Sequence, residues 1–228
     1  MPLDPPAQHD ACRHDWIGLG EDWEQWLRTP LTQEDRDAVE GWRRRGLPLV
    51  VARRQPADAA DDLRLGLSLP DKRRIGVHVA SSAAVTHAGP PALDAVLASA
   101  PAVWWPLLAS VLLAADALGV PARVFGSLAW QHLSGLRYLR PGSDVDLLFA
   151  PRGWGTVEEL LAAMGGLDGF GSADGPRLDG EILLPDSGAV AWRELASLPS
   201  KLLVKGPMDV TLRDRAAVAA LFSEECPA

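Results

Sequence analysis

Two aspartates separated by one residue, Asp144 and Asp146, stand directly before the apolar run Leu147-Leu148-Phe149. In an extended strand, residues two apart point to the same face, so both carboxylates share one face while Val145 points to the other. Adjacent carboxylates repel each other unless a positive charge lies between them, and Mg²⁺ is the usual ion in such a site. The pair therefore predicts a solvent-facing metal site at the mouth of a buried strand. The simpler alternative is a pair of exposed aspartates at a strand start.

A second motif, Gly126-Ser127, lies upstream, where a strand-like run at 122–125 gives way to a helical pattern. Gly126 permits a tight turn, and the free N–H groups and positive dipole end of a helix that begins at Ser127 favour a phosphate. A Gly-Ser pair is also common as a plain helix cap. Its position before the Asp144 strand, in one β-α-β unit, favours phosphate binding.

Metal sites of this kind usually need a third carboxylate from a neighbouring strand. Asp179 and Glu181 alternate onto one face of a strand predicted at 177–184. Period-two alternation places both on that face and does not choose between them. The third carboxylate is therefore left open between the two.

Several further residues could contact a phosphorylated substrate. Lys201, Lys205 and Arg137 are candidates, although a solvated surface charge is the simpler interpretation of each. Tyr138 could stack on an adenine, with packing at a helix end as its simpler role. His132 could act as a general base, and a surface or supporting role is the simpler interpretation.

The elements that must position these residues follow from hydrophobic periodicity. Residues 1–89 predict a small α+β subdomain, with a helix at 33–45 capped by Thr32 and strands at 49–52, 63–69 and 75–80. In the last of these, His78 is expected on an exposed face. Residues 90–228 predict a second domain, and its expected elements are a helical region at 92–118 that buries Trp104 and Trp105, the strand 122–125, the helix 127–136, the strand 145–149, the helix 157–164, a Gly/Asp-rich loop at 165–175, strands at 177–184, 189–192 and 202–204, and a helix at 214–222.

Composition excludes several classes of function. The chain has 228 residues, 47% of them hydrophobic, which suffices for one core and a smaller second one. A net charge of −8 argues against a nucleic-acid partner. The longest apolar stretch is interrupted by Pro106 and Asp116, so no membrane-spanning segment is expected. The sequence thus predicts a cytoplasmic protein without a membrane partner.

The segments Val124-Phe125-Gly126-Ser127 and Asp144-Val145-Asp146-Leu147 together resemble the signature of the DNA-polymerase-β-type nucleotidyltransferase superfamily. A wider set of segments is similar to the malonate decarboxylase holo-acyl-carrier-protein synthase family, also called phosphoribosyl-dephospho-CoA transferase. These segments are Arg13-His14-Asp15, Pro48-Leu49-Val50-Val51-Ala52-Arg53-Arg54, Leu65-Gly66-Leu67, Phe125-Gly126-Ser127-Leu128-Ala129-Trp130-Gln131, Gly135-Leu136-Arg137-Tyr138-Leu139 and Ser143-Asp144-Val145-Asp146-Leu147-Leu148.

The resemblance implies an α+β fold, in which the N-terminal subdomain is followed along the chain by a nucleotidyltransferase domain with a mixed sheet and flanking helices. It implies a transferase that takes 2'-(5''-triphosphoribosyl)-3'-dephospho-CoA. The enzyme attaches the phosphoribosyl-dephospho-CoA part to a serine of the apo acyl carrier protein subunit of malonate decarboxylase and releases pyrophosphate. Asp144 and Asp146 would be catalytic and bind Mg²⁺, two ions in all, while Gly126 and Ser127 would hold the triphosphate. Two alternatives stay open: another nucleotidyltransferase, such as one that transfers AMP, and a nucleotide-binding protein of the same fold without catalysis.

Overall fold

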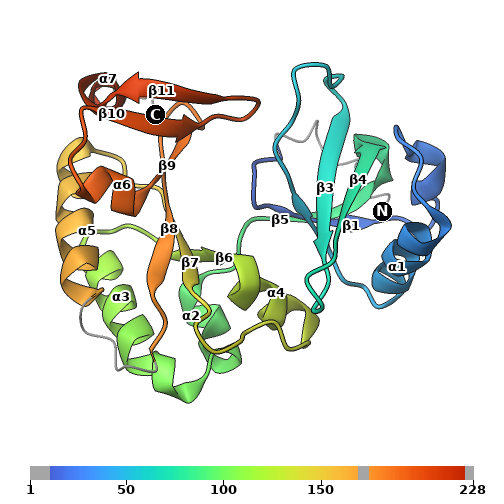
Figure 1. Ribbon diagram of the computed structural model, residues 1–228, viewed down its shortest axis with the longest axis horizontal. Coiled ribbons are helices and arrows are strands. Elements are labelled where there is room, and N and C mark those ends of the chain that lie inside the picture. The colour runs from blue at the N-terminus through green and yellow to red at the C-terminus, as the bar shows by residue number, and fades with distance from the viewer. Residues whose placement is uncertain (1–10, 169–174, 224–228) are drawn as a thin grey trace, which may run out of the picture. The chain divides into compact units, whose positions relative to one another are not determined.

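The computed structural model of the chain describes residues 11–168 and 175–223 (Figure 1). The chain divides into two compact units, Met1–Pro90 and Pro91–Ala228, and each carries its own β-sheet with helices. The prediction of an α+β protein with two sheets is confirmed. The Pro-rich start at 1–10 and most of the Gly/Asp-rich loop lie outside the described residues.

The first unit is built on an antiparallel sheet in the order β4-β3-β2-β1-β5. Its strands are β1 (Trp16–Leu19), β2 (Leu49–Val51), β3 (Asp62–Ser68), β4 (Arg74–Ala80) and β5 (Ala84–Ala88). The alternating leucines of β3 pair with the alternating valines of β4, as Leu65 does with Val77, and bury one common face. The three predicted strands are confirmed, whereas β1 and β5 were missed because neither carries a long alternating pattern.

One longer helix packs in this unit, α1 (Gln33–Arg44). The Thr32 hydroxyl accepts a hydrogen bond from the N–H of Asp35 at 3.2 Å, and acidic residues fill the first turn. Gly46, in the left-handed conformation with φ of 70°, follows its end. The predicted cap and start of this helix are confirmed, and the helix ends at Arg44, one residue before the predicted end. Two short 3-10 helices complete the unit: η1 (Trp23–Trp26) and η2 (Ser81–Ala83).

The second unit is built on a mixed sheet in the order β11-β10-β9-β8-β7-β6. Its strands are β6 (Arg123–Phe125), β7 (Val145–Phe149), β8 (Leu178–Leu183), β9 (Ala189–Ala191), β10 (Lys201–Lys205) and β11 (Val210–Asp214). The pair β7 and β8 is parallel, and every other neighbouring pair is antiparallel. The strand β11, whose residues are mostly exposed, was missed.

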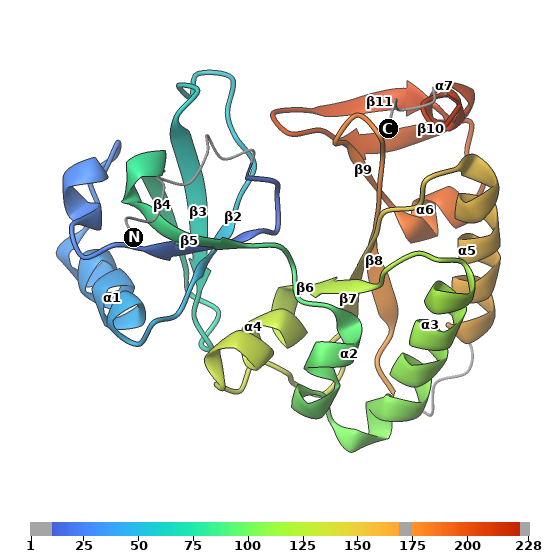
Figure 2. The ribbon, with the colours of Figure 1, turned by 180° about the vertical axis from the view of Figure 1, so that it is seen from behind.

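Helices α3 and α5 pack against each other on one side of this sheet (Figures 1 and 2). The helices of the unit are α2 (Leu93–Val96), η3 (Leu97–Ser99), η4 (Ala102–Trp104), α3 (Trp105–Ala117), α4 (Gly126–Ser134), α5 (Trp154–Leu167), α6 (Trp192–Ala196) and α7 (Arg215–Ala220). The fully buried residues Val145, Leu147 and Phe149 of β7 belong to the core of this unit. No helix in the described ranges is long and apolar enough to cross a bilayer.

Three local predictions for the second unit were wrong. Trp105 is 48% exposed and donates its indole N–H to the carbonyl of Leu97 at 2.9 Å, so of these two neighbouring tryptophans Trp104 lies in the core and Trp105 does not. Gly165 and Gly166 continue α5 instead of opening a loop, since the buried Met164 holds that last turn against the core. Trp192 begins α6 instead of ending a strand.

Candidate active site

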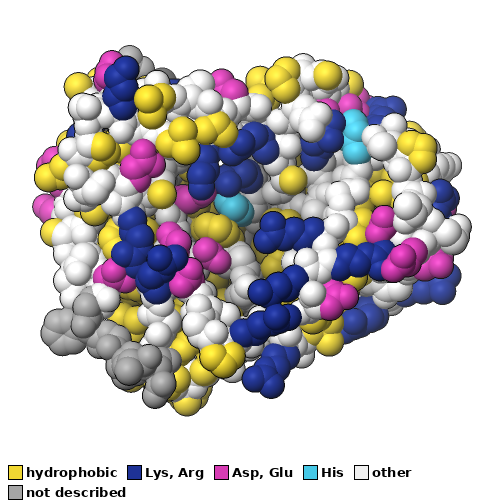
Figure 3. All heavy atoms as spheres, viewed as in Figure 1, with side chains coloured by type: hydrophobic (Ala, Val, Ile, Leu, Met, Phe, Trp, Pro, Cys, Tyr) yellow, Lys and Arg dark blue, Asp and Glu magenta, His cyan; other side chains and the backbone are white. Residues whose placement is uncertain are grey.

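The parallel pairing of β7 with β8 brings the acidic residues of the two strands together. Asp179 is the register partner of Asp146, and Glu181 is the partner of Leu148, the next site-facing position along β7. Asp144 directly precedes β7. Acidic and basic side chains gather over the strands that Figure 1 labels β7 and β8 (Figure 3). Four carboxylates from two adjacent strands therefore meet on one face of the sheet.

Asp146 lies in an electrostatically unfavourable position for a carboxylate. Burial of its side chain raises the pKa of this carboxyl from 3.8 to about 7. The negative charges of Asp179 and then Asp144 act on its pKa in the same direction, and Glu181 adds a smaller effect. Asp146 lies on a strand with a neighbour on either side, and its side chain is half-buried, so the predicted solvent-facing position is met only in part. A positive charge bound beside Asp146 would thus stabilise its ionised carboxylate.

Arg177 supplies part of that charge. Its guanidinium donates to Asp144 Oδ2 at 2.8 Å and to Oδ1 at 3.3 Å, and it lies 3.4 Å from Asp179. The same contacts raise the pKa of Arg177, chiefly through the hydrogen bond to Asp144. The sequence analysis did not predict a role for Arg177, although Arg177 lies two residues before Asp179 and so shares its face of an extended strand.

Glu181 has a different partner. Its side chain is only 5% exposed, and it accepts a hydrogen bond from Lys205 Nζ at 2.7 Å. A buried carboxylate needs such a partner, because an unpaired buried charge is strongly destabilising. Glu181 and Lys205 therefore form an ion pair within the sheet, beside the aspartates.

Gly126 packs directly against Asp146. A Cβ atom at this position would lie 2.0 Å from Asp146 Oδ2, and the residue has a φ of 66°. Only glycine combines that backbone conformation with so close an approach. The glycine of the Gly-Ser motif thus makes room for the Asp146 carboxylate, in addition to allowing the turn.

Helix α4 begins at Gly126, one residue earlier than predicted, with Phe125 in the cap position. Phenylalanine offers no oxygen, and within the described part of the chain no side chain caps this end. The first N–H groups of the helix, that of Ser127 included, are the groups that a phosphate would accept from. They lie next to the carboxylates because Gly126 touches Asp146.

The other predicted substrate contacts lie in several places. Lys201 is exposed on β10, four residues before Lys205 and so about 13 Å along the strand from it. Arg137 is exposed after α4, and His132 shares a hydrogen bond of 3.0 Å with the Ser99 hydroxyl. Tyr138 is 9% exposed and stacks on Trp130 with ring centroids 6.0 Å apart, which favours a packing role.

The aspartates of β7 and β8 have the donor chemistry for a divalent cation, although within the described ranges their oxygens do not gather within 4.8 Å of one another. They offer carboxylate oxygens, the ligands that Mg²⁺ prefers. The raised pKa of Asp146 indicates that a positive ion would be stabilised there. Asp144, Asp146 and Asp179 are each at least partly accessible, whereas Glu181 already has Lys205.

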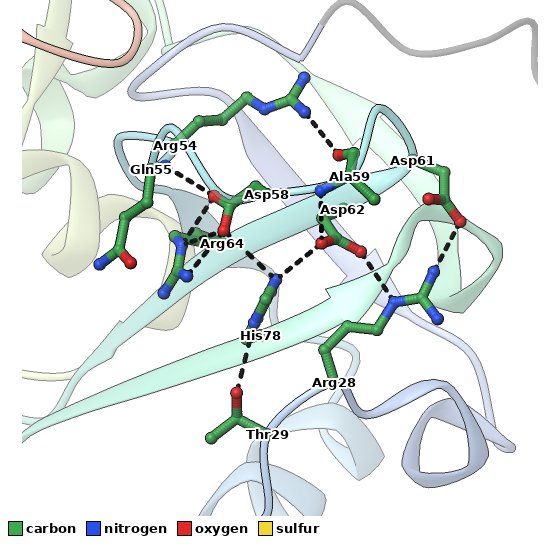
Figure 4. A network of polar contacts seen from close by, with 10 residues as sticks. All are labelled: Arg28, Thr29, Arg54, Gln55, Asp58, Ala59, Asp61, Asp62, Arg64 and His78. Atoms are coloured by element: carbon green, nitrogen blue, oxygen red, sulfur yellow. Dashed lines mark hydrogen bonds and ion pairs between the residues drawn. The ribbon is translucent and has the colours of Figure 1, made fainter.

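A separate cluster in the first unit, of Asp58, Asp62 and His78, could also hold a metal ion, since its ligand atoms lie within 4.8 Å of one another (Figure 4). His78 Nε2 lies 3.2 Å from Asp62, and its side chain is 16% exposed. The prediction of an ordinary exposed histidine was wrong, because the segment that carries both aspartates covers that face. Arg64 donates to both oxygens of Asp58, and Arg28 donates to Asp62. These pairings favour an ion-pair network.

Replacing Asp58 with asparagine tests that network. Arg64 holds the pKa of Asp58 at about 2, below the usual 3.8, so the stabilisation is complete above pH 4 and is lost as the pH falls through 2. We expect Asp58→Asn to lower the free energy of unfolding by roughly 2–4 kcal/mol at pH 7, measured by urea denaturation, and by less near pH 2. The exposed Asp61 provides the control, because Asp61→Asn should change stability by less than about 0.5 kcal/mol. A rise in melting temperature with Zn²⁺ that Asp58→Asn removes would instead make the cluster a metal site.

Comparison with known proteins assigns both units to one family. Residues 12–90 match the model described as phosphoribosyl-dephospho-CoA transferase MdcG N-terminal domain, and residues 92–216 match that of the MdcG C-terminal domain. No solved structure matches the chain.

Curated relatives extend over nearly the whole chain. The phosphoribosyl-dephospho-CoA transferase of Xanthomonas euvesicatoria pv. vesicatoria is 40% identical over 213 residues, which cover 91% of this chain and 96% of the relative. The protein of that name from Xanthomonas campestris pv. campestris is 36% identical over 221 residues, covering 96% and 100%. That of Bradyrhizobium diazoefficiens is 34% identical over 214 residues, covering 92% and 91%. The chain thus belongs to the phosphoribosyl-dephospho-CoA transferase family.

Proposed function

We propose that the carboxylate cluster on β7 and β8 is the active site of a phosphoribosyl-dephospho-CoA transferase. The substrate is 2'-(5''-triphosphoribosyl)-3'-dephospho-CoA, and the acceptor is a serine of the apo acyl carrier protein subunit of malonate decarboxylase. The observation that carries the proposal is the contact of Gly126 with Asp146, which joins a phosphate-binding helix start to a metal-binding carboxylate. The family supplies the substrate and the acceptor.

The predicted domain at residues 90–228, which contains the second unit, is the catalytic domain in this proposal, with a DNA-polymerase-β-type nucleotidyltransferase fold. Three features support that fold. A Gly-Ser turn joins β6 to α4, an Asp-Val-Asp motif opens β7, and a further aspartate comes from the parallel neighbour β8. The same arrangement favours an enzyme over a protein that only binds nucleotides.

Asp144, Asp146 and Asp179 would hold Mg²⁺, and Asp179 is the third carboxylate because it is the register partner of Asp146. An Mg²⁺ ion held by these residues would supply Lewis-acid chemistry: it would lower the pKa of the carrier serine hydroxyl and neutralise negative charge on the departing pyrophosphate. Arg177, which is paired with Asp144 and Asp179, would release these aspartates to the ion and could then bind a phosphate of the substrate.

The N–H groups at the start of α4 donate hydrogen bonds to the triphosphate, since the positive end of the helix dipole favours anions and the Phe125 side chain does not cap these donors. The serine oxygen forms a bond to the α-phosphorus, the bond to the bridging oxygen breaks, and pyrophosphate leaves. The hydroxyl proton passes to solvent. The acceptor is then a phosphodiester of the carrier serine.

Incubation of the protein with apo carrier subunit, Mg²⁺ and the triphosphoribosyl precursor tests the proposal. Mass spectrometry should show the carrier heavier by one phosphoribosyl-dephospho-CoA group, with one pyrophosphate released for each carrier. ATP in place of the precursor is the control for AMP transfer. An unmodified carrier, together with adenylation of another acceptor, would contradict the proposal.

The choice of third carboxylate is tested by two matched substitutions. We expect Asp179→Asn to lower kcat/KM by about a hundredfold or more, because a metal ligand is lost. Glu181→Gln should mainly destabilise the protein, because it leaves Lys205 without its negative partner at the sheet. Steady-state rates at several Mg²⁺ concentrations separate the two effects. Partial rescue of Glu181→Gln, but not of Asp179→Asn, by high Mg²⁺ would reverse the assignment.

A further inference from the structure

An open pocket of about 640 Å³ lies within the second unit, beyond the C-terminal end of α4. This volume falls within the usual range for small-molecule sites, roughly 300–1,000 Å³. Its walls come from the segment before α3, the end of α4 and the connection from α4 to β7. The lining residues are Ser99, Pro101, Val103, Trp104, Gln131, His132, Gly135, Leu136, Arg137, Leu139, Arg140, Pro141, Gly142, Ser143 and Gly175.

The wall formed by the connection is held in place by Gln131. Its side-chain oxygen accepts hydrogen bonds from the backbone N–H groups of Tyr138 and Leu139, both at 3.1 Å. Its amide nitrogen donates to the carbonyl of Ser99 at 2.6 Å, which ties the opposite wall to the same side chain. The pocket is therefore preformed, which reduces the entropic cost of binding.

The chemistry of the lining favours an aromatic anion. Arg137 and Arg140 supply positive charge, and the described residues of the lining include no aspartate or glutamate. Val103, which is 50% exposed, and Trp104 supply apolar surface. Arginine recognises phosphates through several donors, and flat bases bind against apolar and aromatic side chains.

The pocket also borders the carboxylate cluster. Ser143 lines it, and the next residue in the chain is Asp144. In the proposed substrate, one ribose ring separates the reacting phosphorus from the adenosine. The diphosphate attached to that adenosine is a second negatively charged group, apart from the triphosphate. A ligand that spans both sites must therefore place its adenosine near, and not at, the aspartates.

We propose that this pocket binds the adenosine diphosphate part of dephospho-CoA, an inference that rests on the proposed function. Arg137 pairs with the diphosphate, and the base lies against the apolar wall. Gln131 is a positioning residue, because it shapes the pocket through the backbone of the α4 to β7 connection.

Calorimetric titration with 3'-dephospho-CoA, without Mg²⁺, tests this pocket apart from the metal chemistry. We expect binding that ADP competes for and phosphopantetheine does not. Arg137→Ala should weaken it about tenfold, and Arg137→Glu about a hundredfold, because a charge-assisted hydrogen bond contributes roughly 1.5–3 kcal/mol. Arg137 is exposed, so both variants should fold, which thermal unfolding checks. Arg152→Ala, at another exposed arginine, is the control and should bind like the wild type.

The outcomes separate this inference from the proposed function. Unchanged affinity in both Arg137 variants, or no binding of 3'-dephospho-CoA by the wild type, overturns the pocket assignment. If the carrier is modified while Arg137→Glu leaves KM for the precursor unchanged, the pocket fails and the function stands. If the binding pattern holds but no carrier is modified, the pocket stands and the proposed function fails.

Discussion

Replacing Asp146 with asparagine should lower kcat/KM for transfer by about a thousandfold or more and, at the same time, stabilise the metal-free protein. The loss of activity follows because an amide binds Mg²⁺ far more weakly than a carboxylate. The gain in stability follows because burial and the charges of Asp179 and Asp144 oppose ionisation of Asp146, with a pKa of about 7. An uncharged residue there removes that cost.

The gain should depend on pH with a definite sign. Between pH 3.8 and about 7 the folded protein keeps a proton on Asp146 that the unfolded chain releases. Wild-type stability therefore falls as the pH rises through this window, and the cost is complete above pH 7. Relative to wild type, Asp146→Asn should gain little below pH 4 and roughly 2–4 kcal/mol above pH 7, by urea denaturation in EDTA.

Asp144→Asn is the matched control. Asp144 is 34% exposed and paired with Arg177, so this change should abolish transfer equally and give no comparable gain in stability. Addition of Mg²⁺ should raise the melting temperature of the wild type and of neither variant. A fully active Asp146→Asn, or one that Mg²⁺ still stabilises as it does the wild type, would refute the metal assignment.

Replacing Gly126 with alanine should displace the Asp146 carboxylate and lower the rate of transfer. The new Cβ would lie 2.0 Å from Asp146 Oδ2 and 2.9 Å from its Cγ, so the carboxylate must move. Displacement of a catalytic group by about 1 Å can cost a hundredfold in rate, and we expect kcat/KM to fall by at least that factor. Transfer assays at saturating Mg²⁺ measure it.

Gly119 offers a control with the same backbone strain. Its φ is 64°, against 66° for Gly126, and no heavy atom of the described residues lies within 4 Å of a Cβ built there. Alanine at either position costs about 1 kcal/mol for the left-handed conformation. Gly119→Ala should therefore lose stability but keep its rate. Equal losses of activity in both variants would mean that strain, and not contact with Asp146, explains the effect.

Local periodicity was sufficient for much of the fold. The alternation in β3 and β4, the Thr32 cap of α1 and the order of strand and helix from β6 to α5 follow from neighbouring residues, and each is confirmed. The strands β1 and β11 could not be found in this way. The first has no extended alternation, and the second is mostly exposed, so their pairing partners define them.

In the candidate site too, some features follow from local sequence and others only from the tertiary structure. That Asp144 and Asp146 share a face, next to a Gly-Ser turn, follows from the sequence alone, because the alternation of a strand is a local property. The pairing partner of Asp146 cannot be predicted from the sequence alone, since the register between β7 and β8 is set by packing between segments about thirty residues apart. That register places Asp179 beside Asp146. The tertiary fold also pairs Glu181 with Lys205 and Arg177 with Asp144. It packs Gly126 against Asp146. The sequence by itself determined which residue types the chemistry uses, and the tertiary structure decided which of them meet.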